Sequence, residues 1–278
     1  MALPAYLTRS ERIAHFGLRI FVGAVLLFLI APILAIMPLS FNSETFFSYP
    51  MPGYSLKWYF GEYGFFTNER WTNALWLSIV VALATTFLAT ALGTLAALGL
   101  SRGNLPAKAA VMAVLISPMI VPVIISAIGL FFFYAFINLN GTLIGIILAH
   151  TALATPFVVI TVTATLASFD QTLMRAGASC GAAPHTVFFK VVMPLILPGV
   201  ISGALFAFVT SFDEVIVILF IGGPEQRTLP RQMFSGIREL ISPTITAAAS
   251  VLIVFSTALL ITVEMLRRRS ERLRGIRS

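Results

Sequence analysis

Charged residues are scarce in this chain. Asp, Glu, Lys and Arg make up 10% of its 278 residues, whereas hydrophobic residues make up 58%. Soluble domains usually contain about 25% charged residues, so this chain has too few charges to cover a water-facing surface. The net charge of +7 comes from basic residues that gather at the ends of apolar segments and at the tail. In a membrane protein this placement indicates topology rather than a nucleic-acid ligand.

The residues of most catalytic and metal sites are also missing. The single Cys180 excludes a disulfide framework and a cage of Cys ligands. His15, His150 and His185 lie far apart, without metal-ligand spacing, and no glycine-rich phosphate loop occurs. Ser126 and His150 could be imagined as an intramembrane hydrolase, but Ser in a membrane helix usually bonds its own backbone. We therefore expect no catalytic residue, no metal site and no directly bound cofactor, so the chain is not an enzyme.

Long apolar runs are what the sequence does contain. Each is about 20 residues or more, which at 1.5 Å per residue spans about 30 Å of hydrocarbon. Period-2 alternation is absent, so helices rather than barrel strands are expected. No cleavable signal peptide precedes the first run. We predict an all-α polytopic membrane protein with about six spans at Leu18–Leu39, Asn73–Leu100, Ala109–Phe136, Thr142–Leu166, Pro198–Ile221 and Thr246–Leu266.

The Lys and Arg residues set the orientation. Thirteen fall on the side that holds both termini: Arg9, Arg12, Arg19, Arg102, Lys108, Arg175, Lys190, Arg267, Arg268, Arg269, Arg272, Arg274 and Arg277. Five fall on the other: Lys57, Arg70, Arg227, Arg231 and Arg238. The first side is therefore cytoplasmic. We expect a cytoplasmic N-terminus at 1–17, a transmembrane domain at 18–266 and a basic cytoplasmic tail at 267–278. The last outer loop runs against this trend, with three arginines near Glu225 and Glu239.

Three prolines fall inside the third and fourth spans, at Pro118, Pro122 and Pro156. Proline removes a backbone hydrogen bond and bends a helix, and neighbouring helices or water must compensate in a membrane. Kinked helices often line cavities in transporters, but they also occur in helices with a purely structural role, so both interpretations remain open.

The cytoplasmic loop 167–197 reads as two short helices joined by a tight turn. Ala and Met favour the first helix, and Gly181 is able to take a positive φ at its end. Pro184 suits a first helical turn, where its missing N–H is tolerated. Pro194 is expected to end the second helix before the next span. Small residues on the first helix would let a partner's surface approach closely.

This loop resembles the cytoplasmic signature of the permease subunits of ATP-binding-cassette (ABC) importers. That signature is Glu-Ala-Ala, three residues, Gly, nine residues, then Ile-x-Leu-Pro. Here Ala176, Gly181 and Pro194 fall in register, with Arg175 in place of Glu and Gly177 in place of the second Ala. The resemblance implies a MetI-like permease fold and an ATPase-coupling loop. Its residues here are Arg175, Ala176, Gly177, Ala178, Gly181, Pro184 and Pro194.

Further segments resemble the second permease of spermidine/putrescine importers, including Ser40-Phe41-Asn42, Ser211-Phe212-Asp213-Glu214, Thr228-Leu229-Pro230 and Ile241-Ser242-Pro243-Thr244. The resemblance implies a bacterial inner-membrane importer for polyamines. Its partners would be a second permease, two copies of a cytoplasmic ABC ATPase that uses the ATP, and a periplasmic binding protein. Relatives in this group also carry phosphonates, opines and other small solutes, which are the alternative cargo.

A stand-alone secondary transporter is the competing class. Such proteins commonly show two related halves with matching broken helices, and no internal repeat of that kind is evident here. A docking loop would also have no use without a motor subunit.

Asp213 and Glu214 are the intramembrane residues that could carry chemistry. An ionised carboxylate at the bilayer centre costs about 2.5–3.5 kcal/mol on translocon scales, so such a residue rarely lacks a role. Neighbouring residues on a helix point about 100° apart, so at most one of the two is expected to face a solute pathway. The alternative is a structural pairing with a helix end or a partner arginine.

Overall fold

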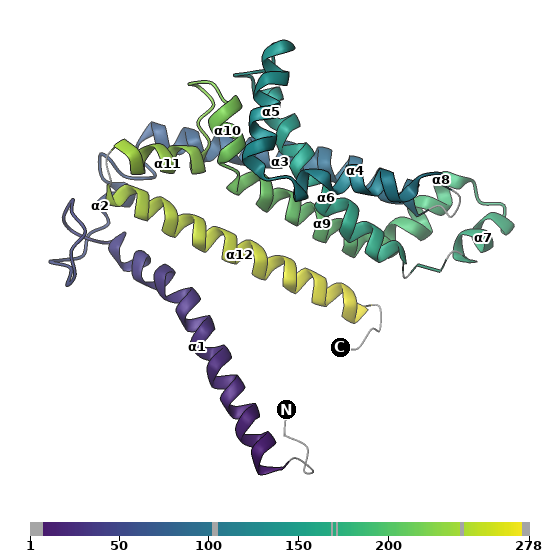
Figure 1. Cartoon of the computed structure of the whole chain (residues 1–278), viewed down its shortest axis with the longest axis horizontal. Helices are drawn as coiled ribbons and strands as arrows, with labels where there is room; N and C mark the ends of the chain where they lie inside the picture. The colour runs from purple at the N-terminus through teal and green to yellow at the C-terminus, as the bar shows by residue number, and fades with distance from the viewer. Residues whose placement is uncertain (1–7, 102–104, 168, 171, 240–241, 274–278) are drawn as a thin grey trace. The chain divides into compact units, whose positions relative to one another are not determined.

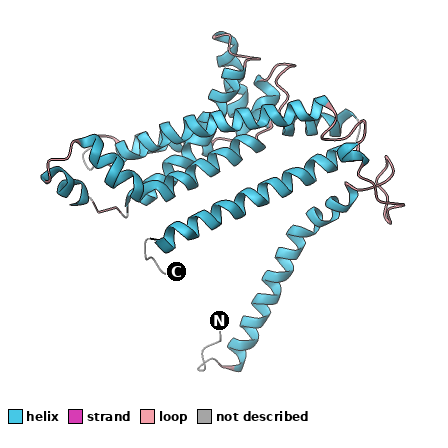
Figure 2. Cartoon of the chain, turned by 180° about the vertical axis from the view of Figure 1, so that it is seen from behind, coloured by secondary structure: helices cyan, strands magenta, loops and turns pink. Residues whose placement is uncertain are grey.

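Helices make up most of the described chain in this computed structural model (Figures 1 and 2). The structure describes residues 8–101, 105–167, 169–170, 172–239 and 242–273. Within these ranges the β-type pairing is a single bridge between Asn42 and Tyr54. Parts of the predicted N-terminal segment (1–7), coupling loop (168 and 171) and tail (274–278) lie outside the described residues. The prediction of an all-α protein is confirmed.

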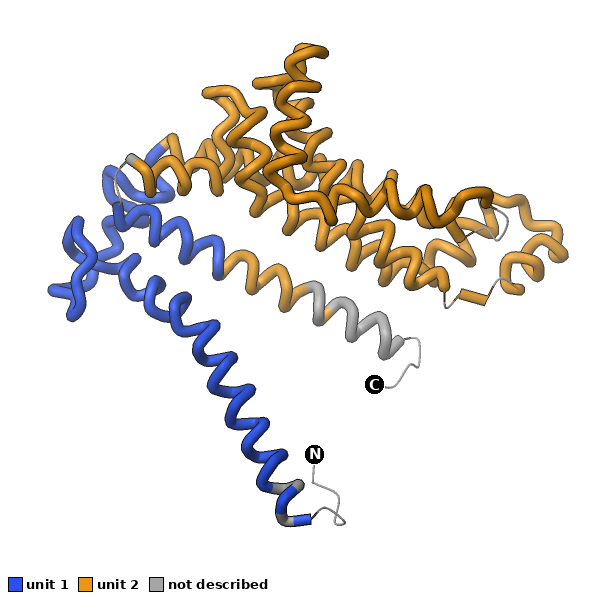
Figure 3. The backbone as a smooth tube through the Cα atoms, in the orientation of Figure 1, with its two compact units in different colours: residues 1–68, 240–253 blue, residues 69–239, 254–278 orange. Residues whose placement is uncertain are grey.

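The chain forms two units, 1–68 with 240–253 and 69–239 with 254–278 (Figure 3). The first contains α1 (Arg9–Leu39), α2 (Lys57–Phe60) and the start of α12 (Pro243–Leu273). Within it, the Trp58 indole donates a 2.7 Å hydrogen bond to the Asn42 carbonyl. The Thr244 hydroxyl donates to the Tyr63 carbonyl at 3.1 Å. The first bond ties the segment after α1 to α2, and the second ties the segment after α2 to the beginning of α12.

The second unit is built around three long helices, α3 (Glu69–Leu100), α6 (Leu143–Ala167) and α9 (Met193–Asp213), which pack against one another. Helix α6 is the most enclosed, with 56% of its most apolar window buried against 28% for α3. Glycines permit the close approach: a Cβ on Gly93 would lie 2.6 Å from Val158, and one on Gly203 would lie 2.9 Å from the Val158 Cα. Small residues are the usual means of packing helices in a membrane.

Shorter helices complete this unit: α4 (Lys108–Ile120), α5 (Val123–Phe136), α7 (Thr172–Ser179), α8 (Pro184–Val187), the π-helix η1 (Phe188–Val192), α10 (Ile216–Ile221) and α11 (Leu229–Glu239). Helix α5 packs mainly against α10. The Gly141 N–H, in the loop after α5, donates a 2.8 Å hydrogen bond to the Ile221 carbonyl at the end of α10.

The third predicted span is broken rather than continuous. Five helical segments are long and apolar enough to cross a membrane, and α4 with α5 adds a sixth if the pair counts as one span bent by 101°. The break falls at Pro122. Its missing N–H and its clash with the preceding residue favour extended backbone, which Val121 adopts at φ −70° and ψ 132°. Pro118 and Pro156 lie inside α4 and α6, as predicted.

The expectation that Pro194 ends a helix is wrong. Helices α8, η1 and α9 follow one another without a gap, and Pro194 lies in the first turn of α9. The Met193 N–H bonds to the Phe188 carbonyl five residues earlier, so the helix changes register just before the proline. This change of register lets the continuous helix pass through Pro194 without ending. The predicted fifth span likewise breaks after Asp213 and does not continue to Ile221.

Candidate functional site

The predicted coupling loop, 167–197, folds as a helical hairpin. Asp170 Oδ1 accepts a 2.8 Å hydrogen bond from the Thr172 N–H at the start of α7, and this bond holds the pKa of Asp170 below its usual range. At the far end Gly181 takes φ +77°, and its N–H donates to the Ala178 carbonyl at 2.9 Å. Pro184 occupies the first turn of α8. The predicted two helices, positive φ and helix-starting proline are all present.

Gly177 lies where the two arms of this hairpin approach closely. A Cβ at this position would lie 3.0 Å from a Val187 methyl group, so α7 and α8 approach closely. At Gly181 a Cβ would meet nothing within 4 Å, so this glycine serves the positive φ rather than close packing within the chain. The two glycines of the predicted signature therefore have different structural roles.

The outer face of α7 is exposed. Its main packing partners within the chain are α8 and η1. Leu173 and Met174 are 42% and 45% exposed. The predicted coupling residues that are exposed are Arg175, Ala176, Ala178, Gly181, Pro184 and Pro194, and Gly177 is half-buried. The structure thus presents most of the predicted set on one short hairpin, with Pro194 ten residues after Pro184 along the continuous helix.

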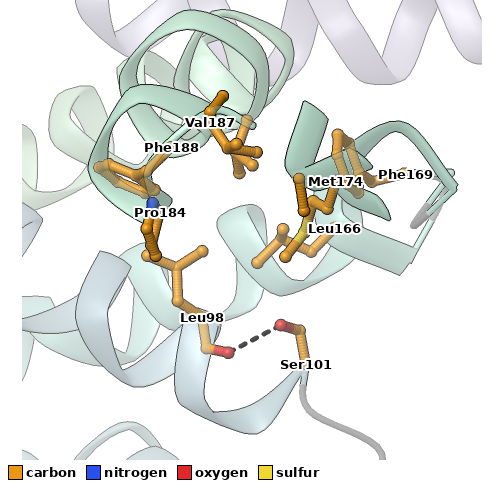
Figure 4. A pocket seen from close by; sticks show the side chains of 11 residues that line it. Leu98, Ser101, Leu166, Phe169, Met174, Pro184, Val187 and Phe188 are labelled. Atoms are coloured by element: carbon orange, nitrogen blue, oxygen red, sulfur yellow. Dashed lines mark hydrogen bonds between the residues drawn. The ribbon is translucent and has the colours of Figure 1, made fainter. Parts of the chain in front are cut away.

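An apolar cavity of about 380 Å³ lies behind the hairpin (Figure 4). Met174 and Phe169 lie on one side of it and Pro184 and Phe188 on the other, with Leu98 from the end of α3 below. The hairpin is therefore not packed solidly against the helices behind it.

The acidic pair lies at the break that ends α9. Glu214 has extended backbone, and its Oε1 accepts a 2.9 Å hydrogen bond from the Val217 N–H in the first turn of α10. It thus caps that helix. Asp213 is exposed, and its carboxylate has no hydrogen bond or ion pair with the part of the chain that the structure describes. The two acids therefore differ: Glu214 has a local structural partner and Asp213 does not.

A buried polar pair next to this break was not predicted. His150 Nδ1 on α6 and Ser211 Oγ on α9 are 2.9 Å apart, and the two residues are 1% and 4% exposed. The partner of His150 is thus Ser211 and not Ser126. The bond ties α6 to the last turn of α9, two residues before Asp213. The pair is separated by 61 positions in the chain, so no local pattern could indicate it.

Comparison with known proteins agrees with this architecture. Residues 89–272 match the family described as "Binding-protein-dependent transport system inner membrane component". The spermidine/putrescine transport system permease protein PotC of Haemophilus influenzae is 30% identical over 250 residues, covering 90% of this chain and 96% of PotC. The putrescine transport system permease protein PotI of Escherichia coli is 32% identical over 233 residues, covering 81% and 82%.

The fold is shared with a solved importer. A chain of a bacterial ABC transporter involved in the import of the acidic polysaccharide alginate has a TM-score of 0.74. It is 15% identical and covers 96% of this chain and 99% of its own length. The predicted permease fold and the resemblance to ABC importer permeases are confirmed. On its sequence match over residues 89–272, this chain belongs to the family of inner-membrane components of binding-protein-dependent transport systems.

Proposed function

We propose that this chain is one of two permease subunits that together form the solute pathway of an ATP-driven importer. A separate ABC ATPase, present in two copies, would dock on the coupling hairpin, and a periplasmic binding protein would deliver the solute. The permease relatives are named as parts of solute transport systems. The hairpin supplies a docking element that a stand-alone transporter would not need.

The observation that carries this proposal is the continuity of the helix that leaves the hairpin. Residues Pro184–Asp213 form one segment of 30 residues, which is about 45 Å long at 1.5 Å per residue. It begins where Val187 packs against Gly177 of α7 and ends at Asp213. A displacement of α7 by an ATPase would therefore reach the acidic residue through a single helix.

Docking is tested by substituting Gly181 in the hairpin and, as its control, Gly141 in the loop before α6. Both are non-helical glycines with positive φ. Gly181 and Gly141 have φ of +77° and +70°, and a Cβ at either has no neighbour closer than 3.7 Å. Asp therefore meets the same backbone strain and similar open space at both sites. We expect Gly181→Asp to lose most of the co-purifying ATPase and uptake, and Gly141→Asp to keep both. Normal ATPase association in Gly181→Asp would remove the docking assignment.

The proposal includes an orientation with both termini in the cytoplasm. The exposed Cys180 would then be inside, and the exposed Thr45, in the segment after α1, would be outside. We expect a membrane-impermeant thiol reagent to label Cys180 only in permeabilised cells. On a Cys180→Ser background, Thr45→Cys should react in intact cells. The reverse pattern would invert the topology.

The solute we propose is a small organic cation of the polyamine class. Two relatives at 30% and 32% identity are named for spermidine or putrescine transport, and Asp213 offers an unpaired carboxylate. A small anionic or zwitterionic solute such as a phosphonate or opine is the alternative. Calorimetric titration of the cognate binding protein should show micromolar binding of putrescine or spermidine. Binding of an anion without a polyamine response would overturn the polyamine proposal.

A further inference from the structure

Helix α6 holds the chain on both sides of the break that follows Asp213. Before the break, its His150 Nδ1 lies 2.9 Å from Ser211 Oγ in the last turn of α9. After the break, Ile146 of α6 shares a buried apolar cluster with Ile218 of α10, and the two helices are in contact. Helix α6 is therefore the common support against which the end of α9 and the start of α10 are placed.

The two acids beside the break belong to different sides of it. Glu214 is tied to α10, because its carboxylate accepts from the Val217 N–H. Helix α10 is in turn anchored to the loop before α6 by the 2.8 Å bond from the Gly141 N–H to the Ile221 carbonyl. Asp213 is the last residue of α9, so its place follows from that helix. Whatever fixes the last turn of α9 also fixes the Asp213 carboxylate.

Stability alone does not account for the buried pair of His150 and Ser211. The two side chains are 1% and 4% exposed, and His150 Nε2 has no hydrogen-bond partner within the described residues. A buried polar atom without a partner costs free energy, whereas two apolar side chains of similar shape are often as stable at such a place or more so. The unpaired nitrogen therefore calls for a reason other than stability.

A hydrogen bond fixes a position more strictly than apolar contacts do. Its strength falls steeply with distance and angle, whereas apolar contacts of the right volume keep stability but specify a unique arrangement less well. Ser211 lies two residues before Asp213, which is about 3 Å along the helix. The bond from α6 therefore sets both the height and the rotation of the turn that carries the Asp213 carboxylate.

We infer that His150 is a positioning residue, whose bond to Ser211 places the Asp213 carboxylate on the path of the cation. The inference rests on the proposed function, in which the solute is a polyamine and Asp213 offers it a carboxylate. His150 is 1% exposed, so it acts on the solute only through Asp213. Because the attraction between two charges falls with their separation, a displaced carboxylate raises the barrier even though it is still present.

The test is a double variant, His150→Leu with Ser211→Ala, in the complete importer. It removes both polar partners and leaves apolar side chains in their place. We expect the uptake of labelled putrescine, normalised to permease content, to fall about fivefold, which is less than the loss expected for removing the carboxylate itself. The midpoint of thermal unfolding and the co-purification of the ATPase should match the wild type, because neither member of the pair is left unpaired.

Thr161→Val is the matched control for the loss of a polar group between α6 and α9. Thr161 also lies where these helices meet, beside Gly203 of α9. Its hydroxyl donates to the Phe157 and Val158 carbonyls of its own helix, so its loss removes no tie between the two helices. Uptake by Thr161→Val should therefore stay near the wild-type rate.

The decisive measurement repeats the double variant on an Asp213→Asn background. With the carboxylate gone there is nothing left to position, so the residual uptake should not fall further. A purely structural bond would lower uptake by the same factor in both backgrounds, because independent effects add as free energies.

Wild-type uptake by the double variant would overturn the inference and leave the proposed function intact. Equal fold losses in the two backgrounds would overturn it as well, and so would a lower unfolding midpoint that accounts for the lost uptake. Normal uptake by Asp213→Asn would remove Asp213 from the pathway and this inference with it. Failure of the wild-type importer to take up putrescine would overturn the proposed solute, and the inference that rests on it.

Discussion

Asp213→Asn should reduce solute uptake by about tenfold or more, which corresponds to about 1.4 kcal/mol of added barrier. A cation that leaves water needs brief compensation of its charge where the dielectric constant is lower, and a carboxylate on the path supplies it. Asp213 is exposed at the end of α9, and its carboxylate makes no hydrogen bond or ion pair within the described residues, so its charge is available. Asn preserves shape and removes the charge. The measurement is uptake in membranes normalised to permease content.

Glu214→Gln is the matched control for this prediction. Its amide oxygen can still accept the hydrogen bond from the Val217 N–H, so the cap of α10 is retained and uptake should stay near the wild-type rate. Glu214→Ala loses the cap and should lower stability by about 1 kcal/mol. If Asp213→Asn transports normally, the carboxylate has no place in the pathway. If it instead lowers permease abundance, its role is structural.

Gly203→Ala should clearly lower the stability of the second unit, because it separates two of its three long helices. The added Cβ would lie 2.6 Å from Thr161 Oγ1 and 2.9 Å from the Val158 Cα. The Thr hydroxyl is able to turn away, but a backbone atom cannot move without separating α6 from α9. Overpacking of this kind typically destabilises by about 1–3 kcal/mol. The measurement is the midpoint of thermal unfolding in detergent, together with yield from membranes.

Gly99→Ala provides the comparison within the same three-helix core. A Cβ on Gly99, in the last turn of α3, meets nothing within 4 Å. Replacement of a helical Gly by Ala favours the helix by about 1 kcal/mol, so this variant should be as stable as the wild type or more so. Equal stability of the two variants would show that α6 and α9 are not held as closely as Gly203 indicates.

The sequence was sufficient to predict those features of the fold that depend on composition or on the backbone preference of a single residue. Scarce charge and long apolar runs can only be accommodated by membrane helices, because lipid leaves backbone groups no other partners. Gly181 and Pro184 act through their own backbone angles, so the turn between α7 and α8 could be predicted from residue type alone.

The tertiary structure decided what depends on contacts between distant segments. Pro122 favours a break in the helix, yet the 101° bend is maintained by packing of α5 against α10, nearly 100 residues further along. Pro194 was expected to end a helix because the effect of proline was judged from its own residue type. In the structure the π-helical register of η1 lets the helix continue through Pro194. The sequence alone does not distinguish the roles of the adjacent acids Asp213 and Glu214. They became distinct only when a break in the helix gave Glu214 a backbone N–H to cap, and when His150, on another helix, bonded the turn that ends at Asp213.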